Sequence, residues 1–183
     1  MTREPLDYAV GQKVVHWLMA FLIILDLFVA QKFGREMAQA DRFESRTDHS
    51  QVGTIIAILL VIRLFLRWRH GAPALPAGMP DWQLRLAKLT HGAFYGLIGL
   101  LIATGILSAY AADSAVTPFG VLAYGDGTAR PALWAAGRTV HVVATNALIT
   151  LIGLHLVAAA YHLVIKRDGS TRRMLRFWRS QRG

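Results

Sequence analysis

The sequence predicts an all-α membrane protein, a bundle of four transmembrane helices, and two observations carry this prediction. Of the 183 residues, 54% are hydrophobic and only 17% are charged, against roughly 45–50% and 25% in soluble domains. The chain also holds four apolar runs, each long enough for the about 17–25 residues that cross a bilayer as a helix. The runs cover residues 14–31, 49–66, 89–110 and 139–165. We therefore expect one membrane domain over residues 1–183, and neither a soluble enzyme nor a disordered chain.

The same four runs exclude several other kinds of protein. They do not alternate between polar and apolar residues, and four strands cannot close a transmembrane barrel. The first run is too long for a signal peptide, carries Asp26 and lacks a small-residue cleavage site, so we expect it to be retained. The chain has no cysteine, which excludes disulfides, iron–sulfur clusters, thiolate zinc sites and thioether-linked haem. Histidine, present seven times, is left as the candidate metal ligand.

The distribution of the net charge of +9 predicts the orientation of the chain. Most lysines and arginines lie in segments 1–13, 67–88 and 166–183, which four spans place on one side of the membrane. By the positive-inside rule, both termini and the 67–88 connection are cytoplasmic in a multi-pass protein of the bacterial inner membrane. The basic tail 166–183 is expected to face lipid headgroups and not nucleic acid. The outer connection 111–137 contains an apolar stretch too short to span, which we expect to cap the bundle in the interface.

Histidines in the fourth run suggest two haems, one above the other. His141 and His155 are 14 residues apart, so on a helix they face within about 40° of each other and are separated by about 21 Å. His162 continues the same stripe about 10 Å further. A bare metal ion would need ligands one turn apart. One buried histidine is explained equally well by a hydrogen bond between helices, but the whole set is not.

Depth in the membrane suggests which histidines act as partners. The second and fourth runs cross in the same direction, and His49 and His141 both stand at the outer end, so they can share an outer haem. His155 lies in the inner half of the fourth run. Its candidate partners by depth are His16 and His91, each at the inner end of a run that leads outward. Depth alone leaves both candidates open.

Basic residues accompany four of these histidines at position i−3, one turn nearer to water on the same helix face. The pairs are Lys13 with His16, Arg46 with His49, Lys88 with His91, and Arg138 with His141. These cations are candidates for binding haem propionates, although cations commonly flank membrane spans.

Three further residues inside the runs are candidates for a role beside a haem. Arg63 follows His49 by 14 residues and shares its face, so it could pair with an inner propionate or extend to the cytoplasm; we favour the propionate. Gly53 would let a porphyrin approach the backbone, or would serve close helix packing. Asp26 could relay protons, accept a hydrogen bond from a ligand histidine, or lie at the outer interface. Of these, we favour the interface.

The pattern as a whole resembles the bacterial cytochrome b561 family, four-helix membrane cytochromes that bind two haems. The resemblance covers nearly the whole chain and rests on several spaced motifs together. These are VVHWLMA, DHSQVGTIIAILLVIRLFLR, AKLTHGAFYGLIGLLIATG and VHVVATNALITLIGLHLVAAAYHLVIKRDGSTRRM.

The resemblance implies a cofactor set and ligands for it. It implies two b-type haems, iron protoporphyrin IX, with His16 and His155 on the inner iron and His49 and His141 on the outer iron. The choice of His16 over His91 comes from the resemblance. It further implies that ubiquinone is a substrate, with a head-group site near the inner haem. The residues suggested for that site are His91, His162 and Lys88.

These expectations lead to a quinone-linked oxidoreductase whose two haems form an electron path across the membrane. The donor would be a periplasmic protein or superoxide, since some members of the family resemble superoxide oxidases. The charges of the outer connections cancel, which gives little electrostatic attraction for the superoxide anion. An alternative is a cytochrome b anchor subunit that links a separate dehydrogenase or hydrogenase to quinone. A third hypothesis, a transporter that uses its histidines for protons or metal ions, predicts a colourless protein.

Overall fold

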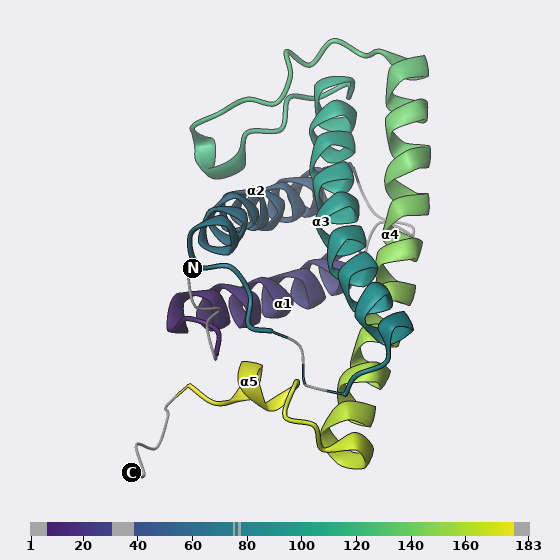
Figure 1. The fold of residues 1–183 in the computed structure, drawn as a ribbon. Helices are drawn as coiled ribbons and strands as arrows, with labels where there is room; N and C mark the ends of the chain where they lie inside the picture. The colour runs from purple at the N-terminus through teal and green to yellow at the C-terminus, as the bar shows by residue number, and fades with distance from the viewer. Residues whose placement is uncertain (1–6, 31–38, 75, 77, 178–183) are drawn as a thin grey trace.

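A computed structural model of the chain describes residues 7–30, 39–74, 76 and 78–177, and all its long elements are helices, as predicted (Figure 1). The four long helices are α1 (Val10–Ala30), α2 (Gln39–His70), α3 (Asp81–Tyr110) and α4 (Pro131–Ala160), and α4 continues into the π-helix η3 (Tyr161–Lys166). Each long helix contains one predicted apolar run, but α2, α3 and α4 begin about 8 to 10 residues before it, and Gln31 at the end of the first run lies outside the described residues. All four are long and apolar enough to cross a membrane, so the chain is a multi-pass membrane protein.

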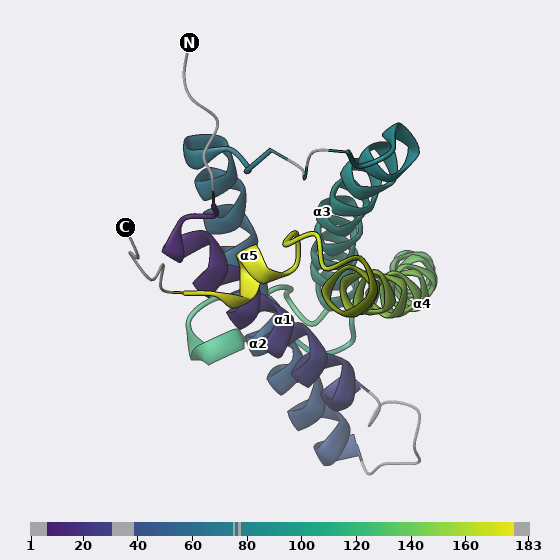
Figure 2. The same cartoon turned by 60° about the horizontal axis from the view of Figure 1, so that its bottom comes forward.

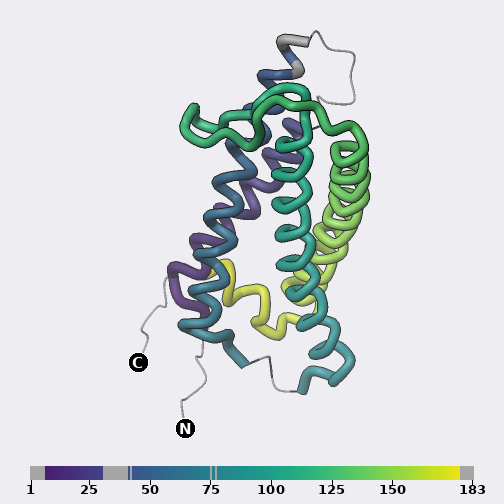
Figure 3. Tube along the Cα trace, turned by 90° about the horizontal axis from the view of Figure 1, so that it is seen from above, coloured from purple at the N-terminus to yellow at the C-terminus, as the bar shows by residue number. Residues whose placement is uncertain are grey.

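The helices pack as two pairs. α1 lies along α2, and α3 lies along α4, whereas α2 and α3 touch over a shorter stretch. Figure 3 shows the two pairs side by side, connected at one end by the segment that joins α2 to α3. The facing sides of all four helices therefore enclose the middle of the bundle, where a buried cofactor can be held from several directions.

A small apolar cluster fills the centre of the bundle. Its buried members are Val15 and Met19 of α1, Ile56, Leu59 and Leu60 of α2, Ile98 of α3 and Leu148 of α4. By contrast, large apolar side chains such as Phe28 and Val157 point outward and are 71% and 70% exposed. Such an apolar exterior is unfavourable in water and is typical of a surface covered by lipid.

Local signals set the helix ends. α2 ends at Gly71, whose φ of +68° belongs to the left-handed region and whose N–H bonds the Arg67 carbonyl at 2.9 Å. Pro131 begins α4 at the position where a missing N–H costs nothing. The Gln12 side-chain amide donates to the Gly71 carbonyl at 2.9 Å and so ties the start of α1 to the end of α2.

The 111–130 connection folds back over the N-terminal half of α2, with a short 3₁₀ turn η2 (Pro118–Gly120) against that helix. The Tyr124 hydroxyl lies 2.7 Å from Thr54 Oγ1. Gly125 approaches the Tyr110 backbone so closely that a Cβ would lie 3.0 Å from it, so a side chain does not fit there. The connection is therefore a cap on the bundle, as the sequence suggested.

The chain after α4 returns across the opposite end of the bundle, where Arg172 and Arg176 are exposed; the expectation that it faces lipid headgroups stays a prediction. Figure 2, in which this end of the molecule is turned forward, shows α5 (Arg172–Leu175) in front of α1. The indole N–H of Trp17 donates to the Met174 carbonyl at 3.0 Å, and Thr171 Oγ1 donates to the Ala159 carbonyl at 3.0 Å. Hydrogen bonds to these backbone carbonyls draw the segment inward. The rest of the tail, residues 178–183, lies outside the described residues.

Candidate functional site

Two histidines face each other near the capped end of the bundle. His49 of α2 and His141 of α4 have ring centroids 6.0 Å apart, with the ring planes at 82°. Two imidazoles that bind one metal ion from opposite sides, each through a nitrogen at about 2 Å, have centroids about 6 Å apart. The structure thus brings together the pair predicted for the outer haem, at a separation that leaves room for an iron between the rings.

Hydrogen bonds at Nδ1 orient both of these rings. His49 Nδ1 lies 2.8 Å from Asp26 Oδ1. His141 Nδ1 lies 3.1 Å from Thr104 Oγ1, and that hydroxyl donates its own proton to the Leu100 carbonyl at 2.7 Å, so it accepts from His141. A neutral imidazole that donates from Nδ1 carries its lone pair on Nε2. Both rings are therefore prepared to coordinate a metal through Nε2.

A cavity of about 440 Å³ adjoins this pair and is lined from all four helices. This volume falls within the range of roughly 300–1,000 Å³ typical of cofactor sites. Gly53 lines it, and a Cβ at Gly53 would meet nothing within 4 Å, so the glycine leaves open space where a flat ring can approach the backbone. A Cβ at Gly105 would instead lie 3.4 Å from His141 Cε1. The residues present therefore fit a large flat cofactor held between His49 and His141.

Two predicted propionate partners also line this cavity, Arg46 of α2 and Arg138 of α4. Arg46 is partly buried, and its guanidinium lies 3.5 Å from Asp113 in the outer connection. In the described part of the chain, no three His, Asp or Glu side chains gather as a bare metal ion would require. Two opposed histidines with arginines beside them suit an anionic, ring-shaped metal complex better.

A second group of histidines lies toward the other end of the bundle. The rings of His91 and His155 are 6.2 Å apart at 78°, close to the geometry of the outer pair, and Phe94 packs on His155 at 5.4 Å. His91 Nδ1 lies 2.7 Å from the Ala87 carbonyl, so it donates there and keeps its lone pair on Nε2. The His16 ring packs at 5.2 Å on Trp17 and interacts electrostatically with His155 and His91.

Comparison with known proteins agrees with this arrangement. A family model described as prokaryotic cytochrome b561 matches residues 7–177. The chain belongs to the prokaryotic cytochrome b561 family. It is 30% identical to cytochrome b562 of Cereibacter sphaeroides, over 96% of this chain and 99% of that protein. It is 24% identical to the probable superoxide oxidase CybB of Yersinia pestis, over 92% and 95%, and 29% identical to cytochrome b561 homolog 1 of Escherichia coli K12, over 71% and 74%.

Membership in the cytochrome b561 family identifies the cofactor and the general reaction of the chain. It is a membrane cytochrome that transfers electrons across the bilayer through b-type haem. Histidine is a common axial ligand of haem iron, and the chain offers histidines on α1, α2, α3 and α4. The cavity beside His49 and His141 is where the described residues fit such a group best.

Arg63 of α2 lies near the second group of histidines. Its guanidinium carbon lies 5.8 Å from the centroid of the Tyr95 ring, and it interacts electrostatically with His16, His91 and His155. Lys88, one turn before His91, is exposed. Arg63 is thus close enough to act on all three of these histidines, and Arg67 acts on His91 as well; a role of Arg63 beside a propionate stays a prediction.

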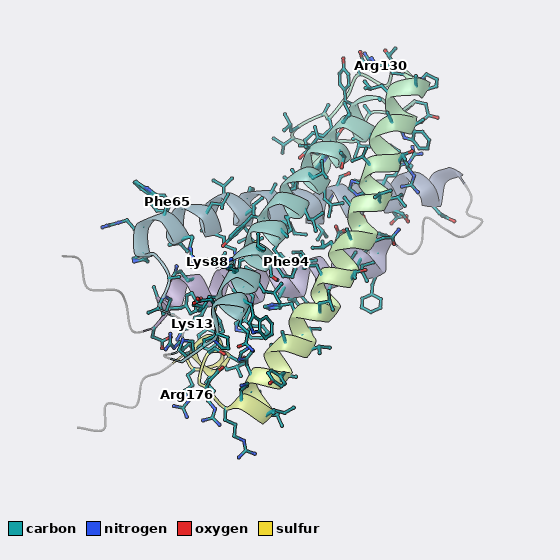
Figure 4. The ribbon with its side chains drawn as sticks, turned by 45° about the vertical axis from the view of Figure 1, so that its right-hand side comes forward. Lys13, Phe65, Lys88, Phe94, Arg130 and Arg176 are labelled. Carbon is teal, nitrogen blue, oxygen red and sulfur yellow. The ribbon has the colours of Figure 1, made fainter. Side chains whose placement is uncertain are left out.

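Lys13 has other partners than the one we predicted. Its side chain is only 3% exposed, and its ammonium lies 2.9 Å from Asp7 Oδ2 and 2.6 Å from the Arg176 carbonyl. Figure 4 shows Lys13 and Arg176 together, at the end of the molecule opposite to Arg130. These contacts give Lys13 a structural role in fastening the C-terminal segment, and its role beside a propionate stays a prediction.

His162 lies in η3 and pairs with a carboxylate of the C-terminal segment. Its Nδ1 lies 2.5 Å from Asp168 Oδ2. Burial acts to raise the pKa of Asp168, but hydrogen bonds from the Ser170 hydroxyl and N–H, and from His162, outweigh it and hold that pKa below its usual value. Because π-helical turns are frequent at functional sites, η3 marks this pair as a candidate site for proton exchange.

Several residues of the site escaped prediction. Thr104 and Gly105 both contact His141 from α3, but a threonine and a glycine inside an apolar run also serve ordinary helix packing. Asp26 was expected at the interface, and the structure instead turns it to His49, with 13% of its side chain exposed. Only the relative rotation of α1 and α2 decides between those positions, and a sequence pattern does not fix that rotation.

Proposed function

We propose that this cytochrome carries electrons across the bacterial inner membrane through two b haems, between a donor on the outer side and ubiquinone on the cytoplasmic side. His49 and His141 hold the outer iron. His155 holds the inner iron together with His16, or with His91 in its place. The observation that carries the proposal is that two opposed histidine pairs, 6.0 and 6.2 Å apart, occur at two levels of one bundle.

The two levels suit electron transfer between two centres. His141 and His155 are 14 residues apart on α4, which corresponds to about 21 Å along the helix. Haem supplies a one-electron redox centre, and two histidines per iron leave no position for oxygen. The residues of this chain fix the rings, exclude water with an apolar bundle, and neutralise the propionates with Arg46, Arg138 and Arg63.

For the second ligand of the inner iron, the residue contacts and the family resemblance favour different histidines. The ring of His91 packs on His155, which favours His91 as the partner. The resemblance favours His16, which lies within electrostatic range of the same histidine. We propose His16 as the ligand and His91 as a neighbour that donates to the Ala87 carbonyl, and haem content after single substitution decides between them.

For the quinone, we propose a head-group site at the cytoplasmic end, formed by His162 and by His91 and Lys88 of α3. Reduction of a quinone consumes two protons, so a site for it needs groups that exchange protons with water. The pairing of His162 with Asp168 at 2.5 Å supports this assignment. His162→Ala is expected to slow quinone reduction while both haems stay bound, whereas Arg85→Ala, an exposed change on α3, leaves the rate unchanged.

On the outer side, superoxide is the proposed donor, because one relative is a probable superoxide oxidase and Arg46 and Arg138 line the cavity there. Positive groups beside the site favour an anionic donor. Superoxide is expected to reduce the purified protein, and added salt to slow the reaction. If superoxide fails while a co-purifying dehydrogenase or hydrogenase reduces the haems, the protein is instead an anchor subunit.

The proposed orientation can be tested separately. The chain contains no cysteine, so single cysteines can be introduced without a background. Ser114 lies in the outer connection and Ser170 in the segment after η3. A membrane-impermeant thiol reagent is expected to label Ser114→Cys from the periplasm of intact cells and Ser170→Cys only after lysis. The reverse pattern would invert the topology.

The experiment that tests the central proposal is haem counting in single variants. Wild type is expected to hold two haems per chain, and His49→Ala, His141→Ala and His155→Ala one each. His70, exposed at the end of α2, gives the matched control, because His70→Ala should keep both haems. Two haems in both His49→Ala and His141→Ala would refute the assignment of the outer site.

A further inference from the structure

Asp26 is a carboxylate inside an apolar stretch of α1, and the structure gives it one specific partner. Its Oδ1 lies 2.8 Å from His49 Nδ1, and the two side chains are 13% and 27% exposed. An ionised group within a membrane span is unfavourable unless it is paired. Its position is therefore better explained by its contact with His49 than by helix packing.

The three other hydrogen-bonded histidines of the bundle show what is special about this contact. His141 donates from Nδ1 to the Thr104 hydroxyl, and His91 donates to the Ala87 carbonyl. Both acceptors are neutral. His162 has a carboxylate partner, Asp168, but it lies in η3 near the cytoplasmic end. Of the two proposed ligands at the outer site, His49 bonds a carboxylate and His141 bonds a neutral hydroxyl.

We propose that Asp26 is a positioning residue that lowers the reduction potential of the outer haem through its hydrogen bond to His49. The proposal rests on the proposed role of His49 as an iron ligand. A carboxylate that accepts the Nδ1 proton makes the imidazole a stronger electron donor. A more electron-rich ligand stabilises the oxidised iron more than the reduced iron, and hydrogen bonding around the ligands is a recognised control of haem potential.

Other charges at the same cavity act in the opposite direction. Arg46 and Arg138 line it and favour the reduced iron, which carries less positive charge. Their presence does not change the sign of the effect of Asp26, because the test compares proteins that differ only at that carboxylate. The Arg46 guanidinium also lies 3.5 Å from the Asp113 carboxylate in the outer connection, and this ion pair offsets part of the positive charge of Arg46.

The test is a redox titration of the purified haem-loaded protein, followed in the visible spectrum. Asp26→Asn keeps the shape and an oxygen acceptor but removes the charge. The haem that disappears in His141→Ala is the outer one, and its component is expected to move upward in Asp26→Asn. At its original midpoint, the ratio of reduced to oxidised outer haem should rise about tenfold, which is about 59 mV for one electron. Asp48→Asn, an exposed change beside His49, should leave both components in place.

Each other outcome has a defined meaning. If Asp26→Asn binds both haems and neither component moves, or only the inner one moves, the proposal is wrong. If Asp26→Asn loses the outer haem, Asp26→Glu decides: retention of that haem at the wild-type potential supports a carboxylate acting on His49, and its loss overturns the proposal in favour of packing. If His49→Ala keeps both haems, the ligand assignment itself has failed, and this result is separate from any result at Asp26.

Discussion

Thr104 offers the sharpest test of how the outer site is built. The residue is 7% exposed, and its hydroxyl donates to the Leu100 carbonyl while accepting the Nδ1 proton of His141 at 3.1 Å. Thr104→Val has nearly the same shape but cannot accept a proton. The substitution therefore leaves the His141 ring without the contact that holds its orientation and its tautomer.

The structure allows a magnitude to be assigned to this change. A buried donor left without an acceptor costs about 1–3 kcal/mol. If the ring must keep this orientation to bind iron, the cost falls on the haem-bound state, and affinity for the outer haem drops by about 5- to 150-fold. The inner haem, held from other residues, should keep its affinity.

The assay is a haemin titration of haem-free protein, in which bound haem is counted by the pyridine haemochrome method. Thr150→Val is the matched control, because Thr150 donates to the Asn146 carbonyl in the same i−4 manner but is exposed. Thr104→Ser restores a hydroxyl and should restore affinity. Equal titration curves for Thr104→Val and Thr150→Val would show that the hydroxyl does not orient His141.

Three further predictions concern other parts of the bundle. Gly105→Val should abolish the outer haem alone, because its side chain would press on a ligand ring at 3.4 Å and fill the cavity; Gly99→Val, where a Cβ has open space, is the control, and equal haem contents would contradict this. Trp17→Phe removes the hydrogen bond to the C-terminal segment, so amide exchange in residues 172–177 should quicken by about 2- to 12-fold, for about 0.5–1.5 kcal/mol; unchanged exchange would show that the contact does not hold the segment. Hydrogen bonds from Arg130 hold the pKa of Asp126 below its usual range, so its contribution to stability is complete above about pH 4 and is lost only in stronger acid. The melting-temperature difference between wild type and Asp126→Asn should therefore be equal at about pH 5.5 and about pH 8, and a difference that vanishes by about pH 5.5 would contradict the lowered pKa.

The sequence predicted the long-range architecture because membrane spans follow a local rule. About twenty consecutive apolar residues are enough to cross the bilayer whatever their neighbours are, so the number and order of the four spans were predicted, although α2, α3 and α4 begin about 8 to 10 residues before the apolar runs do. Helical periodicity also placed His141 and His155 on one face. The depth argument paired His49 with His141, and the rings are indeed 6.0 Å apart.

What the sequence could not predict depends on contacts between helices. The roles of Asp26 and Thr104 follow from how α1 turns toward α2 and α3 toward α4, and packing sets these rotations. Likewise, the basic charge of the segment after η3 predicted a tail that faces lipid headgroups, but it did not predict that the backbone carbonyls of this segment accept hydrogen bonds from Lys13 and Trp17. Charge patterns describe side chains and give no information about such backbone contacts.

The measurement that tests the central claim most directly is a reduced-minus-oxidised visible spectrum of the detergent-purified protein, with haem counted per chain in wild type, His141→Ala and His155→Ala. We expect sharp low-spin b-type bands, two haems in wild type and one in each variant, with different spectra for the two remaining haems. One haem in wild type, or two haems in both variants, would contradict the assignment of two histidine-ligated haems to these two levels of the bundle.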